Sequence, residues 1–246
     1  MAQGKKVALI TGANRGIGFE TAKQLGEKGV TVVLGSRKLG DAEAAAAKLK
    51  TNGIEAYPVQ LDVTKPADRD ATYKFIDQKF GKLDILINNA GVAPATEFGV
   101  NTTTKTTEEE LKSVYETNFF SVVGLTQQLL PLIRKSDAGR IVNLSSILGS
   151  LTLHADPGSP IAAAKLFSYN SSKSALNAFT IHLADELKNT PIKVNSVHPG
   201  WVKTEMGTDA APMEIPEGAK TSVAAALLGS DGPSGRFIHL GQELPW

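Results

Sequence analysis

The sequence predicts an α/β protein built on a doubly wound parallel sheet of about seven strands, with helices on both faces. Short, nearly continuous apolar runs alternate with longer helical stretches along the 246 residues, which is typical of parallel strands buried on both sides. A glycine-rich turn joins the first apolar run to the first helical stretch, as in the tight strand-to-helix connections of such sheets. No repeat or linker divides the chain, so we expect a single domain over residues 1–246.

The first half of the chain alternates strand and helix regularly. Gly29 ends the first expected helix, the second is alanine-rich, and Pro66 suits the first turn of a third helix that reaches Phe80. We therefore predict strands at residues 6–10, 30–34, 56–61 and 83–87, and helices at residues 16–28, 41–50 and 66–80.

The second half contains longer connections. A polar, threonine-rich loop is expected at residues 96–107, before a long helix at 108–133, and a further helix at 169–188. Strands are expected at 140–144, 192–197 and 236–240. Two irregular regions, 149–168 and 200–218, each follow a strand. They should therefore lie at the carboxyl edge of the sheet, where open α/β sheets bind ligands.

Charge and composition exclude several classes of protein. The net charge is +1 and the basic residues are spread along the chain, which gives no electrostatic case for binding nucleic acid or an anionic membrane. Cysteine is absent and the four histidines lack ligand spacing, so we expect no disulfide and no metal site. The first apolar run is too short for a signal peptide, and no run is long enough to span a membrane. We expect a soluble cytoplasmic protein.

The glycine-rich turn predicts a dinucleotide-binding site. Glycines allow a tight turn and a close approach of the backbone to a pyrophosphate, and the following helix offers unpaired N–H groups to the phosphates. The spacing Gly-x-x-x-Gly-x-Gly differs from the more widespread Gly-x-Gly-x-x-Gly pattern. The cofactor-binding candidates in this turn are Gly12, Asn14, Arg15, Gly16, Ile17 and Gly18.

The end of the second expected strand favours NADPH over NADH. An enzyme that uses NADH needs a carboxylate here to bind the ribose 2′-hydroxyl, whereas this chain has Ser36 followed by Arg37. The planar guanidinium of Arg37 suits a 2′-phosphate, and Arg15 is placed to contact the same group. The alternative is that Arg37 is merely solvated and Ser36 is neutral to both cofactors.

Tyr169 and Lys173 form a candidate acid/base pair. Residues four apart lie on the same face of a helix, and a nearby ammonium favours the phenolate and lowers the pKa of a tyrosine from about 10. Alone the pair is a weak signal. The acid/base interpretation of the pair is strengthened by the glycine-rich turn near the start of the chain.

Several motifs in the expected order resemble the short-chain dehydrogenase/reductase family, a group with a Rossmann-type fold. The resemblance covers nearly the whole chain. It places the cofactor-binding part at about 1–145 and the catalytic and substrate-binding part at about 146–246. Beyond the glycine-rich turn, the motifs are Asp62-Val63, Asn88-Asn89-Ala90-Gly91, Asn118, Ser145-Ser146, Tyr169 with Lys173, and Pro199-Gly200 with Val202 and Thr204.

The resemblance implies a catalytic tetrad. Tyr169 would donate a proton to the substrate oxygen, and Lys173 would lower the pKa of Tyr169 and bind the nicotinamide ribose. Ser146 would hydrogen-bond the carbonyl oxygen, and Asn118 would hold a water that connects Lys173 to solvent. Additional cofactor contacts are implied at Asp62 and Val63 (adenine), at Val202 and Thr204 (nicotinamide carboxamide), and at Asn89, Ala90, Gly91, Pro199 and Gly200.

The spacing of 23 positions (169 − 146) between Ser146 and Tyr169 is longer than in most of the family. Such an insertion resembles the carbonyl reductase branch, in some members of which it covers a dimerisation face. We therefore favour a monomer, with a homodimer or homotetramer as alternatives. The apolar pocket candidates are Ile147, Trp201 and Met206.

The activity we expect is NADPH-dependent reduction of a hydrophobic ketone or aldehyde to an alcohol. Three alternatives remain open. They are a 3-oxoacyl thioester reductase, a sugar or polyol dehydrogenase, and a non-enzymatic NADP(H)-binding sensor.

Overall fold

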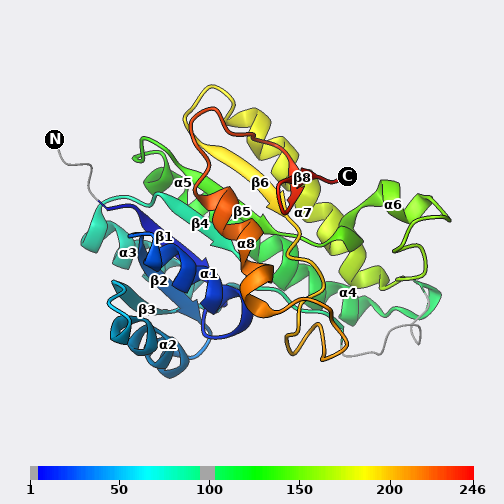
Figure 1. The fold of residues 1–246 in the computed structure, drawn as a ribbon, viewed down its shortest axis with the longest axis horizontal. Coiled ribbons are helices and arrows are strands. Elements are labelled where there is room, and N and C mark those ends of the chain that lie inside the picture. The colour runs from blue at the N-terminus through cyan, green and yellow to red at the C-terminus, as the bar shows by residue number, and fades with distance from the viewer. Residues whose placement is uncertain (1–4, 95–102) are drawn as a thin grey trace.

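The computed structural model describes residues 5–94 and 103–246, and Figure 1 shows their arrangement around one sheet. The strands lie in the order β3-β2-β1-β4-β5-β6-β7-β8. Strands β1 to β7 run parallel and β8 pairs antiparallel with β7. The predicted doubly wound parallel sheet is confirmed. Its strands are β1 (Val7–Thr11), β2 (Thr31–Ser36), β3 (Ala56–Gln60), β4 (Ile85–Asn88), β5 (Arg140–Leu144), β6 (Lys193–Val197), β7 (Phe237–His239) and β8 (Gln242–Glu243).

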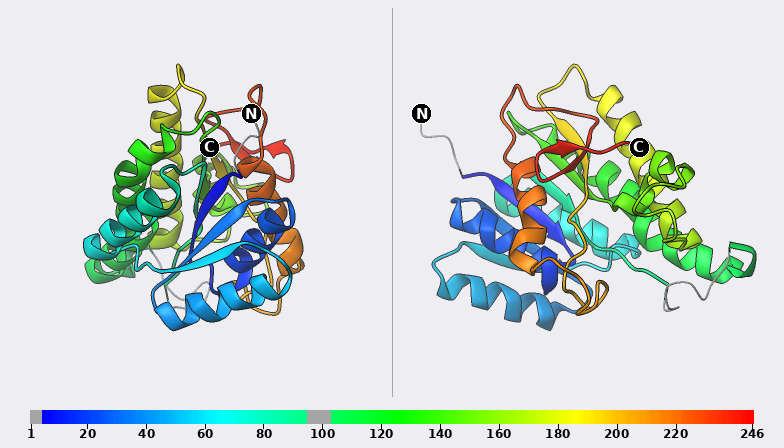
Figure 2. Two further views of the ribbon diagram at one scale, coloured as in Figure 1. Left: turned by 90° about the vertical axis from the view of Figure 1, so that its left-hand side faces the viewer. Right: turned by 45° about the vertical axis from the view of Figure 1, so that its right-hand side comes forward.

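Helices cover both faces of the sheet (Figure 2). The side chains of β1 alternate between the two layers, because successive residues of a strand point to opposite faces. Ala8 and Ile10 join the core under one set of helices, and Val7 and Leu9 join the other. The first face carries α1 (Gly16–Glu27), α2 (Leu39–Thr51) and α8 (Ile215–Ala226), and the second carries α3 (Pro66–Phe80), α5 (Ser121–Ile133) and α7 (Phe167–Glu186).

Local sequence explains where α3 begins and ends. Pro66 occupies its first turn, where a missing N–H costs nothing because that group has no partner within the helix. Gly81 closes the helix in the left-handed conformation, with φ 71°, which glycine adopts without steric cost. The predicted bounds of this helix are confirmed.

The predicted helix at 108–133 consists of three consecutive segments. They are α4 (Glu108–Tyr115), a π-helical turn η2 (Glu116–Phe120) and α5. The wider π turn inserts one extra residue per turn, and it carries the fully buried Asn118. Most of the predicted loop at 96–107 lies outside the described residues. Its described end holds a 3₁₀ turn, η1 (Thr103–Lys105).

Both predicted irregular regions contain helical structure. The first begins at the last residue of the 3₁₀ turn η3 (Ile147–Gly149) and includes the short helix α6 (Leu151–Ala155), and the second ends inside α8. Pro216, which the sequence places in an irregular region, stands in the first turn of α8, where proline is favoured. Among the described residues, no helix is both long and apolar enough to cross a membrane.

Candidate active site

The strand order changes direction at β1, because β2 and β3 lie on one side of it and β4 lies on the other. The turns that follow β1 and β4 touch. A Cβ placed on Gly12 would lie 3.2 Å from the Ala90 Cα. The Asn89 side chain donates to the main-chain oxygens of Thr11 (2.8 Å) and Gly12 (3.1 Å). Asn89 thus holds the glycine-rich turn in place. Such a reversal point is where open α/β sheets bind nucleotides.

The N-terminus of α1 can receive an anion. Arg15 precedes the helix without a side-chain cap, and the first turn contains no acidic residue. The positive end of the helix dipole and its N–H groups therefore lack a competing carboxylate. Gly18 allows this geometry, because a Cβ there would lie 2.5 Å from the Asn89 amide nitrogen and overlap the Gly12 carbonyl. The backbone cradle fits a pyrophosphate.

The residues predicted to select the cofactor lie at the carboxyl ends of β2 and β3. Ser36 is buried and ends β2, and Arg37 follows it in an exposed position. After β3, Val63 is buried and Asp62 accepts hydrogen bonds from the Thr64 backbone and hydroxyl. Burial raises the pKa of Asp62, but these hydrogen bonds and nearby Lys65 outweigh it, so the pKa is lowered overall.

Arg15 makes an ion pair that the sequence did not predict. Its Nη2 lies 2.5 Å from Oε2 of Glu205 in the connection after β6. Thr204 also approaches the glycine-rich turn, since a Cβ on Gly16 would lie 3.7 Å from its Cγ2. The connection after β6 therefore reaches across to the turn after β1. The Glu205 carboxylate pairs with the Arg15 guanidinium, which the sequence predicts to contact a 2′-phosphate.

Ser146, Tyr169 and Lys173 converge beside these turns. Ser146 lies just after β5 and hydrogen-bonds Tyr169 on α7. One turn further along α7, the Lys173 Nζ lies 5.6 Å from the centre of the Tyr169 ring and donates to the Leu144 carbonyl at 2.8 Å. The neighbouring Ser145 hydroxyl is buried without a hydrogen-bond partner, and the choice of Ser146 over Ser145 stays a prediction.

The electrostatics of the pair differ from the expectation. Burial raises the pKa of Tyr169, and the hydrogen bond from Ser146 only partly opposes this. Burial also lowers the pKa of Lys173 to about 8. The predicted lowering of the Tyr169 pKa by Lys173 is not seen. The ammonium is directed to the Leu144 carbonyl, and desolvation disfavours the charged form of both groups.

Asn118 reaches the same place from the π turn. Its amide oxygen accepts from the Val92 N–H at 2.8 Å, and its amide nitrogen donates to the Val92 carbonyl (2.8 Å) and the Ser172 hydroxyl (3.1 Å). A Cβ on Gly91 would lie 3.3 Å from the Asn118 Oδ1 and 3.6 Å from the Lys173 Nζ. The Asn118 side chain thus ties the turn after β4 to α7, and its predicted water-holding role stays a prediction.

A buried chain of polar side chains fixes α7 on the sheet. The Asn143 amide on β5 donates to the Thr180 hydroxyl on α7 (2.9 Å), which lies 2.8 Å from the Ser196 hydroxyl on β6. On the other side of Asn143, its oxygen accepts from Asn88 on β4 at 2.9 Å. Hydrogen-bonded polar groups in a dry interior rigidify their surroundings. They therefore hold the helix that carries Tyr169 and Lys173.

The predicted pocket walls come from the connection after β6 and from η3. Trp201 and Met206 are exposed, and the Trp201 indole donates to the Gly207 carbonyl at 2.7 Å. Val202 is buried and pairs with Met213 in an isolated bridge. Pro199 and Gly200 (φ 94°) turn the chain into this connection. Ile147 opens η3 directly after Ser146.

Sequence reasoning missed two histidines that contact the turn after Ser146. His198 Nδ1 lies 3.3 Å from the Ile147 N–H. His154, in the insertion, places Nε2 3.0 Å from the Leu148 carbonyl. The sequence alone gives His198 no role beyond that of an ordinary residue at a strand end, and it places His154 only in an insertion that could line the pocket. The described residues contain no group of three or more histidines and carboxylates able to hold a metal ion.

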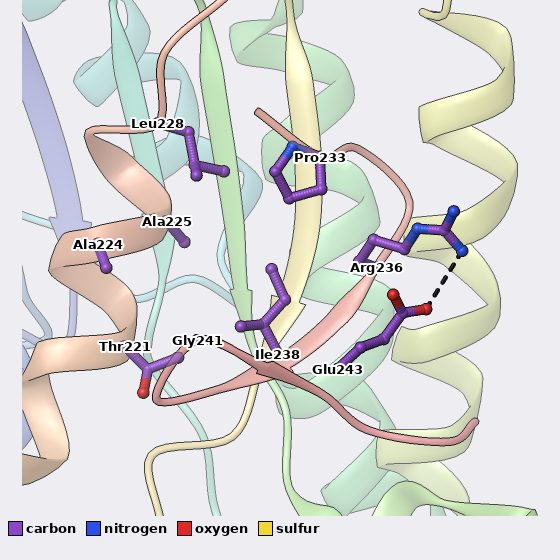
Figure 3. A pocket seen from close by; sticks show the side chains of 9 residues that line it. All are labelled: Thr221, Ala224, Ala225, Leu228, Pro233, Arg236, Ile238, Gly241 and Glu243. Carbon is purple, nitrogen blue, oxygen red and sulfur yellow. Dashed lines mark hydrogen bonds and ion pairs between the residues drawn. The ribbon is translucent and has the colours of Figure 1, made fainter. Parts of the chain in front are cut away.

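A pocket of about 270 Å³ lies away from these residues, between α8 and the last two strands (Figure 3). Its walls are mostly apolar, and the Arg236–Glu243 ion pair (3.2 Å) stands at one side. None of the four tetrad candidates lines it. Its lining residues are Thr221, Ala224, Ala225, Leu228, Pro233, Arg236, Ile238, Gly241 and Glu243.

Comparison with known proteins agrees with this geometry. Residues 6–215 match the family model described as short chain dehydrogenase. Salutaridine reductase of Papaver bracteatum is 35% identical over an aligned length of 292 residues, and the alignment covers 94% of this chain and 93% of that protein. A 3-oxoacyl-[acyl-carrier-protein] reductase of Staphylococcus aureus is 34% identical over 229 residues (92% and 86%). An NADPH-bound carbonyl reductase from chicken fatty liver superimposes with a TM-score of 0.85 at 28% identity, covering 98% and 99%. The chain therefore belongs to the short-chain dehydrogenase family of oxidoreductases.

Proposed function

We propose that this oxidoreductase is an NADPH-dependent carbonyl reductase that converts a hydrophobic ketone or aldehyde to an alcohol. The observation that carries the proposal is the convergence of Ser146, Tyr169 and Lys173 next to the touching turns after β1 and β4. The similarity to salutaridine reductase and to NADPH-bound carbonyl reductase supports the same chemistry.

The protein side of the reaction follows from the site. When bound, the nicotinamide supplies a hydride, and the protein supplies orientation and electrostatics. Tyr169 donates its proton to the carbonyl oxygen. Its raised pKa keeps it protonated, as a donor must be. Ser146, held against Tyr169, hydrogen-bonds the same oxygen and stabilises its developing charge. Lys173 binds the nicotinamide ribose. Asn118 positions the Val92 main chain and Ser172 beside Lys173.

Steady-state assays with NADPH or NADH and a panel of aryl ketones, α-keto esters and diketones test the proposal. We expect oxidation of NADPH with several of these carbonyls, and much slower oxidation of NADH. If NADPH binds tightly but no carbonyl in the panel is reduced, the carbonyl reductase proposal is wrong. That result would favour an enzyme with a narrow substrate range or the NADP(H)-binding sensor.

The similarity to the S. aureus protein keeps a 3-oxoacyl thioester reductase as a second candidate. Its discriminating substrate is a 3-oxoacyl thioester, assayed beside the free ketones. A higher kcat/KM for the thioester than for every ketone would favour this candidate. The sugar or polyol dehydrogenase is tested in the same assay by NADP⁺ reduction with polyols, and we expect none.

Replacing Arg37 with alanine should weaken NADPH much more than NADH. Arg37 follows Ser36 in an exposed position, where a guanidinium can pair with a 2′-phosphate. We expect KM for NADPH to rise roughly tenfold or more, since a charge-assisted hydrogen bond contributes about 1.5–3 kcal/mol, while KM for NADH changes less than about twofold. Steady-state kinetics with both cofactors measure this, with Lys38→Ala as the matched control. An equal effect on both cofactors would mean that the 2′-phosphate is bound elsewhere.

Replacing Glu205 with glutamine should tighten NADPH binding. In the wild type the Glu205 carboxylate pairs with Arg15, so a 2′-phosphate must compete for the guanidinium. Both side chains are exposed, so the pair is weak, and we expect Kd for NADPH to fall about two- to fivefold with little change for NADH. Titration of cofactor fluorescence measures both constants, and Glu214→Gln on the same connection is the control. An unchanged or weaker Kd for NADPH would show that Glu205 does not compete.

We also propose that the protein is a cytoplasmic monomer. The insertion before Tyr169 packs on the first turn of α7, where the Asn170 amide donates to the Ala164 carbonyl at 2.8 Å. Sedimentation velocity tests the oligomeric state, and a dimer would contradict the proposal.

A further inference from the structure

Two imidazoles continue the hydrogen bonding of the sheet beyond the ends of β5, β6 and β7. The last backbone hydrogen bond between β5 and β6 runs from the Ser145 N–H to the Val197 carbonyl at 2.8 Å. The ladder cannot continue through Pro199, which has no N–H to donate. Beyond this point a side chain replaces the backbone as the acceptor: the His198 Nδ1 accepts a hydrogen bond from the Ile147 N–H at 3.3 Å.

His239 supports His198 from the other side. The His198 N–H donates to the Ile238 carbonyl at 2.8 Å, and the His239 Nδ1 lies 2.9 Å from the His198 carbonyl. The two rings lie 4.8 Å apart at an interplanar angle of 42°. A carbonyl oxygen only accepts, so Nδ1 of His239 carries a proton. Since the Ile147 N–H only donates, Nδ1 of His198 carries none. The His198 proton is therefore on Nε2.

The turn that His198 holds is the one that presents Ser146. The Ser146 Oγ accepts from the Leu148 N–H at 3.2 Å, and the Gly149 carbonyl accepts from the Ser174 hydroxyl on α7 at 2.9 Å. On its outer side, the Leu148 carbonyl contacts His154, whose Nδ1 faces the Lys165 ammonium at 3.2 Å. The imidazole of His198 thus joins this turn to β6 and, through His239, to β7.

We infer that His198 is a positioning residue for the Ser146–Ile147 turn, and that His239 fixes the orientation in which His198 can accept the Ile147 N–H. The inference rests on the proposed function, because the turn matters through the contact of Ser146 with the carbonyl oxygen. Burial, together with the charge of His239, lowers the pKa of His198 to about 3. The ring therefore stays neutral and Nδ1 stays an acceptor at physiological pH.

A pair of substitutions separates positioning from simple packing. His198→Leu removes the acceptor, whereas His198→Asn keeps an acceptor oxygen near the place of Nδ1. We expect His198→Leu to lower kcat about ten- to hundredfold, because small misplacements of a reacting group have effects of this size, with Kd for NADPH changed by less than about threefold. His198→Asn should recover most of kcat. His182→Leu, an exposed residue of α7, is the control and should match the wild type.

Two outcomes would overturn the inference in these variants. One is a kcat for His198→Leu within about twofold of the wild type. The other is equal kcat for the leucine and asparagine variants when both bind NADPH as the wild type does.

The ¹⁵N NMR spectrum of the imidazoles tests the inference independently of activity. We expect His198 to be neutral with its proton on Nε2 between about pH 5 and about pH 8, and His239 Nδ1 to be protonated. A proton on Nδ1 of His198, or titration near its ordinary pKa of about 6.5, would contradict the inference. Because this readout needs no substrate, it stands even if the proposed carbonyl reduction fails.

Discussion

Tyr169→Phe is expected to lower kcat by about a hundred- to ten-thousandfold, which is the usual contribution of a positioned proton donor. The substitution keeps the ring on α7 and removes only the hydroxyl that Ser146 contacts. Because the cradle after β1 and the Lys173 ammonium are untouched, Kd for NADPH should stay within about threefold. Single-turnover oxidation of bound NADPH by a ketone measures the loss directly.

The control for this substitution is Tyr115→Phe. Tyr115 ends α4 in an aromatic cluster with Phe119 and Phe120, so removal of its hydroxyl should leave kcat unchanged. Near-wild-type turnover of Tyr169→Phe would refute the assignment of Tyr169 as the donor. In that case the proton would have to come from another group, with Ser146 as the nearest candidate.

Arg140→Leu is expected to have the largest effect on stability. Arg140 is only 2% exposed, and its guanidinium donates hydrogen bonds to the carbonyls of four residues. These hydrogen bonds join β5 to the connections before β6 and after α8. Leucine would leave the Pro191 and Leu228 carbonyls without these donors, at about 1–3 kcal/mol for each buried group, whereas Gly139 and Gly229 keep hydrogen bonds from the Lys193 and Gly232 N–H groups. We expect a loss of at least about 3 kcal/mol in the free energy of unfolding, or a fall in Tm of roughly 6–12 °C. The four acceptors are Gly139, Pro191, Leu228 and Gly229.

Thermal unfolding of Arg140→Leu beside Arg134→Leu measures this effect. Arg134 is exposed and lies 3.9 Å from Glu186, so its loss should change stability by less than about 0.5 kcal/mol. If the two variants unfolded at the same temperature, the Arg140 hydrogen bonds would not contribute to stability. Burial lowers the pKa of Arg140, which reflects the desolvation that these hydrogen bonds offset.

The strands and strand ends were predictable because their signals are local. Buried parallel strands appear as short apolar runs, and the glycine-rich turn, Asn89 and Ser146 follow such runs at the carboxyl edge. The helix of Tyr169 and Lys173 brought both residues together as its period predicts.

What the sequence did not predict depends on contacts between distant segments. The π turn around Asn118 depends on hydrogen bonds to Val92 and Ser172. The sequence does not predict α8 at all, because Pro216 and Gly218 resemble loop residues, although Gly218 permits close packing on Val202. The two-residue β8 is too short to show a pattern. The pKa of Tyr169 required knowledge of its burial, and the Arg15–Glu205 pair joins positions 190 residues apart (205 − 15).

The most direct test of the central claim follows the hydride itself. The enzyme would be given a reducible ketone and NADPH that carries deuterium at C4 of the nicotinamide, in each of its two diastereomeric forms. The account predicts an alcohol with deuterium on its carbinol carbon from one of the two forms and none from the other. Alcohol without label from both forms, or oxidation of NADPH without any alcohol, would contradict the account.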